Sequence, residues 1–139
     1  MSQDVRVVYL AGPYSVYKDR EKAFQLHLKV VRWLIGRGHS VYSPIVHGHV
    51  ISRNVFYDGV EFNWWEDIEP RFIRAVDAVL FIYTPELWKS RGCQREALYA
   101  LLMRKPIGLV MSEEGDSIDE FSPTKVVWLS PRRGDEDDG

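Results

Sequence analysis

The sequence predicts an α/β protein, a single domain in which helices cover both faces of a mostly parallel five-stranded sheet. Short apolar runs rich in β-branched and aromatic residues alternate along the chain with segments of helix length. The 139 residues are enough for one domain with an ordinary apolar core. The single cysteine, Cys93, excludes a disulfide framework and a zinc site built on several cysteines.

Five segments are expected to be strands. Residues 5–10 and 78–83 are apolar runs with few polar residues, as in strands that are covered on both faces. Shorter strands are expected at 40–42, 107–110 and 125–129.

Three helices are expected between these strands: residues 20–37, a segment that ends near Ala75, and residues 93–104. In the first, apolar residues recur at helical spacing, and Gly36 and Gly38 are typical stop residues. The alternation is typical of a doubly wound (Rossmann/flavodoxin-like) sheet with parallel strands and right-handed crossovers.

Such a sheet binds ligands outside the carboxyl ends of its strands, at the point where the strand order reverses. Three segments are expected to meet there: the turn 11–15, a long loop 43–62, and residues 84–92. We therefore look for site residues in these segments.

Charge limits the class of partner. The net charge is −2, and four of the last five residues are acidic, so we expect a folded domain at 1–131 and a disordered acidic tail at 132–139. The domain lacks the strongly basic face that long nucleic acid requires, which favours a small-molecule ligand. No apolar run reaches membrane length, and the amino terminus lacks a secretory signal, so we expect a cytoplasmic protein without a membrane partner.

The segment from Ser90 to Glu96 is the most informative one for chemistry. Ser90 and Gly92 precede an expected helix, whose free N–H groups and positive dipole end suit a phosphate, and Lys89 and Arg91 add positive charge. Glu96 lies four residues beyond Gly92, about 6 Å along a helix, roughly the span of a sugar ring. The alternative is that Ser90 is only a helix cap and Glu96 a surface acid.

The turn after the first strand is a weaker candidate. Gly12 and Pro13 lack the spacing of a dinucleotide fingerprint, so Gly12 either binds a ligand or only permits a tight turn. Tyr9, close to the end of the strand, could be an ordinary core residue.

An acidic segment precedes the third strand. Asn63 and Glu66 could form a capping box that opens a helix, or Pro70 could lie in the first turn of a later helix. Asp67 or Glu69 could face Glu96, and paired carboxylates suit glycosyl chemistry. The alternative is a solvated acidic helix start.

Other residues of these segments are weaker candidates. The tryptophans could stack a nucleobase or pack in a core or interface: Trp64, Trp65 and Trp88.

Three further features give weak signals. His47 and His49 lack a third ligand at metal spacing, so we expect surface or gating histidines and no metal site. Asp77, at the amino end of the third strand, is assigned to local hydrogen bonding. Cys93 lies at a helix start, where a thiol pKa is lowered, yet no histidine is placed to activate it.

Together, three elements resemble the nucleoside 2-deoxyribosyltransferase superfamily between Val5 and Val110. They are the turn Tyr9-Leu-Ala-Gly-Pro-Tyr, the acidic helix before Val76-Asp77, and Ser90-x-Gly92-x-x-x-Glu96. The resemblance implies that Glu96 is a nucleophile that forms a covalent deoxyribosyl-enzyme, and that Tyr9 orients it. It implies no metal and no organic cofactor, and a homodimer or higher homo-oligomer.

Two departures refine this resemblance. The family's further acid falls on Glu69, a glutamate where an aspartate is usual, and a shift of position would substitute Asp67. Members that act on free nucleosides carry an aspartate at the position of Ser90, which would repel a phosphate. The chain is therefore more similar to the deoxynucleoside 5′-monophosphate N-glycosidases, which implies hydrolysis of a nucleotide's N-glycosidic bond, with base transfer to an acceptor as an option. The other hypothesis from the residues is a nucleotide-binding or sensing module without turnover.

Overall fold

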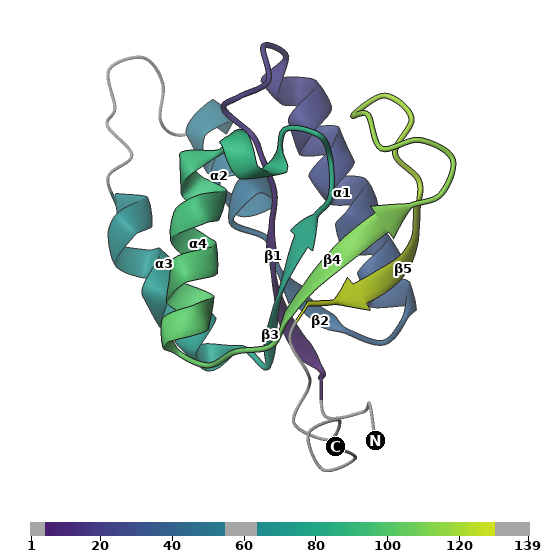
Figure 1. Cartoon of the computed structure of the whole chain (residues 1–139). Coiled ribbons are helices and arrows are strands. Elements are labelled where there is room, and N and C mark those ends of the chain that lie inside the picture. The colour runs from purple at the N-terminus through teal and green to yellow at the C-terminus, as the bar shows by residue number, and fades with distance from the viewer. Residues whose placement is uncertain (1–4, 55–63, 130–139) are drawn as a thin grey trace.

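The computed structural model describes residues 5–54 and 64–129 and has an α/β fold with a five-stranded sheet (Figure 1). The predicted tail at 132–139 lies outside the described residues. The strands are β1 (Val7–Ala11), β2 (Ser40–Tyr42), β3 (Ala78–Ile82), β4 (Ile107–Ser112) and β5 (Pro123–Trp128). The helices are α1 (Arg20–Gly36), α2 (Pro44–Asn54), α3 (Trp64–Ala75) and α4 (Arg91–Leu102), with a short 3₁₀ turn, η2 (Leu87–Lys89).

The strand order is β2-β1-β3-β4-β5, and the sheet is mixed. The first four strands are parallel, as expected of a mostly parallel sheet, but β5 runs antiparallel to β4, so the doubly wound pattern of parallel strands does not extend to this edge. The physical reason is the connection. Residues 113–122 contain no helix and are fewer than the dozen or more that a parallel crossover requires.

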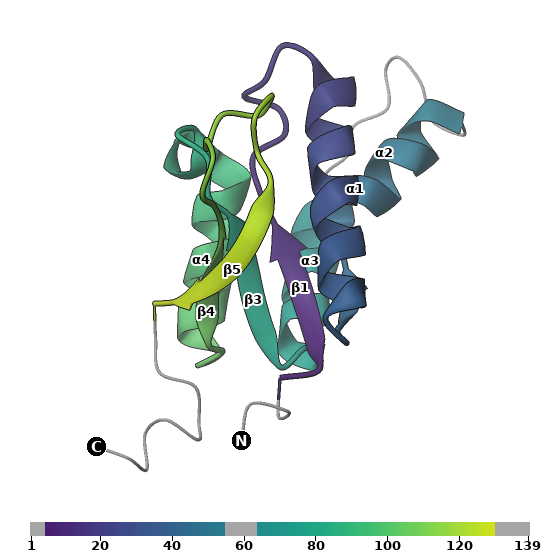
Figure 2. The same cartoon turned by 90° about the vertical axis from the view of Figure 1, so that its right-hand side faces the viewer.

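Helices cover both faces of the sheet, as predicted (Figure 2). The inner side of α1 packs on one face through Leu26, Val30 and Leu34. On the other face, α3 contributes Ile73, and α4 contributes Cys93 and Ala100. Strands β1, β3 and most of β4 are buried, which explains their nearly continuous apolar sequence.

Helix α1 begins and ends close to the expected residues. Asp19 caps it by accepting a hydrogen bond from the Lys22 backbone N–H, and Gly38 follows it with a positive φ of 95°. That left-handed conformation favours glycine, so the predicted stop at this glycine is confirmed.

Helix α2 corrects the expectation of a loop at 43–62. Ser43 accepts a hydrogen bond from the Val46 N–H, and Pro44 is the first helical residue. A serine cap followed by proline is a helix start, and this signal was available in the sequence. The remainder of that predicted loop, from residue 55, lies outside the described residues.

Helix α3 begins at Trp64, so the alternative in which Pro70 occupies the first turn is wrong. Pro70 lies inside the helix, where it removes one backbone hydrogen bond. The proposed cap at Asn63 lies outside the described residues. The side chains of Trp64 and Trp65 are likewise not described.

The amino edge of the sheet is held by Asp77, as predicted. Its carboxylate accepts hydrogen bonds from the backbone N–H groups of Arg6 and Val7, each at 2.9 Å.

Within the described ranges, no helix is long and apolar enough to cross a membrane.

Candidate functional site

The register of the sheet places two tyrosines side by side. Tyr9 of β1 pairs with Tyr42 of β2, and paired residues of parallel strands point to the same face. Their ring centroids are 5.7 Å apart. Tyr9 packs with residues of α3 and α4, so both side chains lie on the face that these helices cover.

Helix α4 brings Glu96 to the same face. Ser90 caps the helix by accepting a hydrogen bond from the Cys93 N–H at 3.2 Å, so the interpretation of Ser90 as a cap is confirmed. Cys93, Glu96 and Ala100 form the buried stripe of α4, at the spacing of one helical face. The alternative that Glu96 is a surface acid is wrong, because Glu96 is only 5% exposed.

Glu96 is bound directly by Tyr9. The Tyr9 hydroxyl donates a hydrogen bond of 2.5 Å to Oε2 of Glu96. Burial and the negative charge of Glu69 raise the pKa of Glu96 to about 8, while the Tyr9 hydrogen bond and the Arg95 charge oppose that rise. Burial and the Glu96 charge in turn raise the pKa of Tyr9 well above its usual value, so its hydroxyl stays a proton donor.

A second buried carboxylate, Glu69 of α3, completes the cluster. Arg95 donates to it from Nε at 2.8 Å and from Nη2 at 3.0 Å, a bidentate ion pair that joins α3 to α4. Asp67 is exposed and lies on another side of α3, two residues away. Of the two acids left open by the sequence, the structure therefore brings Glu69, and not Asp67, to the cluster of Glu96.

The side chain of His27 packs against the turn that follows β1. Gly12 and Pro13 are buried, and a Cβ on Gly12 would lie 2.7 Å from Cε1 and 2.9 Å from Nε2 of His27. The His27 ring is fully buried and lies 3.2 Å from the Pro13 carbonyl oxygen through Nε2. Burial lowers the pKa of His27 to about 4, so the ring is neutral at physiological pH. Close packing is thus sufficient reason for glycine at position 12.

The start of α4 differs from this turn. A Cβ on Gly92 would meet only Arg95 Nη2 and Ser90 Oγ, both at 3.8 Å, an ordinary contact distance. Lys89 and Arg91 are exposed on either side of the Ser90 cap. Crowding in the folded protein therefore does not explain why position 92 is a glycine. The predicted phosphate contact at Gly92 remains a prediction.

Two interactions join the loops at the carboxyl edge. The Tyr17 hydroxyl lies within hydrogen-bond distance of Thr84 Oγ1 and Glu86 Oε1, at 2.9 and 3.0 Å, which links the loops that follow β1 and β3. His49 of α2 is 2.6 Å from the Tyr14 hydroxyl through Nδ1.

His49 has further structural partners. Its ring stacks on Phe24 with centroids 4.3 Å apart, and its Nε2 is 3.1 Å from Glu21. His49 thus connects α2 with α1. No group of three metal-ligating side chains occurs among the described residues.

The expectation for Cys93 is corrected. Although it lies near the start of α4, Cys93 is fully buried, and burial with the nearby Glu96 charge raises its thiol pKa above the usual range. A helix start lowers a thiol pKa only where the anion is stabilised more than burial disfavours it. Trp88, in contrast, is 43% exposed, and its ring centroid lies 5.3 Å from that of Phe81.

Arg95, His27 and Tyr42 were not among the sequence candidates. His27 had a signal, because it continues the apolar stripe of α1 and a polar residue there requires a buried partner. Tyr42 and Arg95 had none, because their roles depend on strand register and on how α3 packs against α4.

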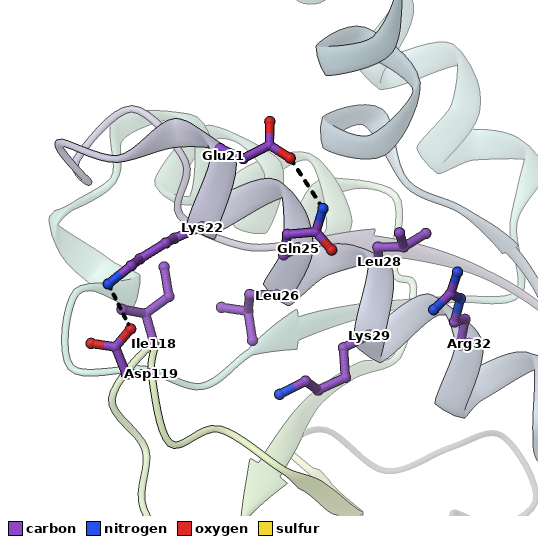
Figure 3. A pocket seen from close by; sticks show the side chains of 9 residues that line it. All are labelled: Glu21, Lys22, Gln25, Leu26, Leu28, Lys29, Arg32, Ile118 and Asp119. Carbon is purple, nitrogen blue, oxygen red and sulfur yellow. Dashed lines mark hydrogen bonds and ion pairs between the residues drawn. The ribbon is translucent and has the colours of Figure 1, made fainter.

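A surface hollow of about 440 Å³ lies elsewhere, between α1 and the loop before β5 (Figure 3). Both lysines that line it have partners within the fold. Lys22 pairs with Asp119 at 3.0 Å, and Lys29 donates to the Phe121 carbonyl at 2.9 Å. This hollow is lined by α1, on the opposite face of the sheet from Glu96.

The chain belongs to the family described as DUF1937, a domain of unknown function, whose profile matches residues 6–113. The matched region includes all the candidate site residues, from Tyr9 to Glu96. A search of curated proteins gives no match.

Proposed function

We propose that this protein hydrolyses the N-glycosidic bond of (2-deoxy)nucleoside 5′-monophosphates, with Glu96 as the nucleophile. One observation carries the proposal. A buried carboxylate, Glu96, accepts a short hydrogen bond from Tyr9 and shares its cluster with a second buried carboxylate, Glu69. Enzymes that cleave glycosidic bonds commonly use two carboxyl groups in different environments.

The reaction has two steps. An oxygen of Glu96 forms a bond to C1′ of the sugar while the C1′–N bond breaks, and the base leaves with the electron pair and takes up a proton. Water then adds to C1′ and releases one proton, which replaces the proton that the base took up, while the Glu96–sugar bond breaks and the carboxylate is restored. With a second base as acceptor in place of water, the same intermediate would give base transfer.

Tyr9 and Glu69 have different roles in this proposal. The Tyr9 hydroxyl holds one oxygen of Glu96 and so orients the other oxygen toward C1′. Glu69 assists departure of the base, directly or through its effect on the charge of Glu96. Because both oxygens of Glu69 accept hydrogen bonds from Arg95, proton donation from Glu69 requires Arg95 to move.

The phosphate is proposed to bind at the start of α4, against the backbone N–H of Gly92 and the hydroxyl of Ser90. The free space around a Cβ at Gly92 and the exposed cations Lys89 and Arg91 support this assignment. The turn at Gly12 and Pro13 would border the sugar from the β1 side. The chemistry uses no metal and no organic cofactor.

A second candidate function is a nucleotide-binding or sensing module without turnover. The observation that favours it is the bidentate ion pair of Glu69 with Arg95, which engages the group that would supply the proton. Binding of a nucleotide without release of base would identify this alternative.

The outer side of α4 supports self-association of the protein. Leu98, Leu101 and Leu102 are 54%, 63% and 72% exposed and lie at helical spacing, so they form one apolar strip. We assign a second copy of the chain to this strip, which gives a homodimer next to the helix that carries Glu96. A role in nucleotide metabolism, in the cytoplasm, is consistent with this proposal.

The test is a base-release assay. Wild-type protein and Glu96→Ala are incubated with the four common deoxynucleoside 5′-monophosphates, and free base is separated by chromatography. We expect release from at least one nucleotide by the wild type and a loss of at least about 1,000-fold in the variant, as for removal of a nucleophile. Equal rates in both proteins would refute the role of Glu96.

A further inference from the structure

Tyr42 has a buried hydroxyl that makes no hydrogen bond in the described part of the chain. It is the last residue of β2 and lies at the carboxyl edge of the sheet, beside Tyr9. A buried polar atom without a partner is uncommon in folded proteins and calls for a specific explanation. The two paired tyrosines therefore differ: one hydroxyl holds Glu96, and the other is unused.

Aromatic neighbours fix the ring of Tyr42. Phe72 of α3 stacks on it with centroids 4.0 Å apart and planes at 5°. The Tyr9 ring lies at 5.7 Å on the sheet side, and His47 lies edge-on at 6.0 Å. These three aromatic contacts hold the Tyr42 ring, so the fold sets the position of its buried hydroxyl.

The carboxylate cluster acts on this hydroxyl. Burial and the charges of Glu69 and Glu96 raise the pKa of Tyr42 to about 12, so the group stays protonated and remains a donor. The Glu69 carboxylate, and Glu96 whenever it is ionised, would repel a phosphate near this hydroxyl. The partner that suits the site is therefore a neutral acceptor oxygen.

We infer that Tyr42 binds the substrate, donating its hydroxyl hydrogen bond to a neutral acceptor oxygen on the sugar or the base of the nucleotide. The inference rests on the proposed function for the identity of the ligand, and on the unused hydroxyl, its fixed ring and the nearby carboxylates for the contact. It assigns a binding role to a residue of the second strand, on the other side of Tyr9 from β3.

The test compares Tyr42→Phe with wild type and with Tyr99→Phe, a partly buried tyrosine of α4 that serves as the matched control. Three quantities are measured: thermal unfolding without ligand, the dissociation constants of the deoxynucleoside 5′-monophosphates by calorimetry, and kcat/KM for base release. We expect Tyr42→Phe to unfold at the wild-type temperature or above it, because it removes an unpaired polar atom. We expect its nucleotide affinity to fall about 10-fold, and that of Tyr99→Phe to be unchanged.

A 2′,3′-dideoxynucleotide and nucleotides with altered base carbonyls locate the acceptor. The analogue that lacks the acceptor should bind wild type and Tyr42→Phe equally well. Unchanged affinity for every nucleotide in Tyr42→Phe would overturn the inference. A clear loss of stability without ligand would also overturn it, since the hydroxyl would then have a partner in the free protein.

Failure of the proposed function gives a different result. If wild type binds nucleotide without releasing base, and Tyr42→Phe weakens that binding, the role of Tyr42 stands while hydrolysis is refuted. If wild type binds none of the nucleotides, both proposals are overturned.

Discussion

At the scale of single residues, the protonation of Glu96 is set by opposing effects. Burial and Glu69 favour the neutral acid, while the Tyr9 hydroxyl and Arg95 favour the carboxylate. The outcome is a pKa of about 8, so much of Glu96 is protonated in the free protein at neutral pH. A positive charge developing on the sugar would favour the anion and so help the ionised form to react.

This balance predicts the pH dependence of base release. Only the carboxylate form of Glu96 attacks, and it is populated as the pH rises through its pKa. We therefore expect kcat/KM to increase about tenfold per pH unit below pH 8 and to level off above it.

The variant Glu69→Gln removes a negative charge and frees the positive charge of Arg95, and both changes lower the pKa of Glu96. The pH profile of kcat/KM for this variant should therefore shift to lower pH by about one unit. A shift to higher pH, or a rate that falls as the pH rises toward 8, would contradict this account of the cluster.

At the scale of elements, the turn after β1 depends on α1. His27 fills the space that a side chain at Gly12 would need, and its Nε2 faces the carbonyl oxygen of Pro13. The helix thus determines the path of the chain from the strand that carries Tyr9.

This packing predicts non-additive effects of two substitutions. Gly12→Ala should lower the free energy of unfolding by about 1–3 kcal/mol, because its Cβ would overlap the imidazole. In a His27→Ala background the same substitution should have an effect below about 0.5 kcal/mol. The four proteins are compared by denaturant unfolding, and a simple sum of the two single effects would show that the contact is not responsible.

The same scale shows what the sequence can predict. The five strands and three of the four helices were expected, because apolar runs and helical spacing are local signals. Helix α2 was missed although Ser43 and Pro44 carry a start signal, because its apolar pattern is weak. The direction of β5 depends on the length of the connection before it, and the alternation of elements does not contain that information.

The candidate site was only partly predictable. Glu96 was named from its spacing beyond Gly92, and the roles of Glu96 and Tyr9 came from the resemblance. Their contact requires a helix and a strand 87 residues apart to meet. The ion pair of Glu69 with Arg95 and the pairing of Tyr9 with Tyr42 depend on helix packing and strand register. Neither leaves a local pattern in the sequence.

At the scale of the whole molecule, the proposed dimer depends on the leucine strip of α4. Leu101→Lys should convert the dimer to a monomer, because it places a charge at the centre of a buried contact. Ile35→Lys, at a residue of α1 that is 56% exposed, is the matched control and should remain dimeric. Sedimentation velocity distinguishes the two states. A monomeric wild type, or a dimer unaffected by Leu101→Lys, would show that the leucine strip is not a dimer interface.

The most direct test of the whole account is to look for the sugar on Glu96. Wild type is mixed with a deoxynucleoside 5′-monophosphate that it cleaves and is quenched with acid during turnover. The protein is then digested and its peptides are analysed by mass spectrometry. We predict a deoxyribosyl 5-phosphate adduct on the peptide that contains Glu96, and no adduct in Glu96→Gln. An adduct on a different residue, or undiminished base release by Glu96→Gln, would contradict the claim that this buried carboxylate attacks the sugar.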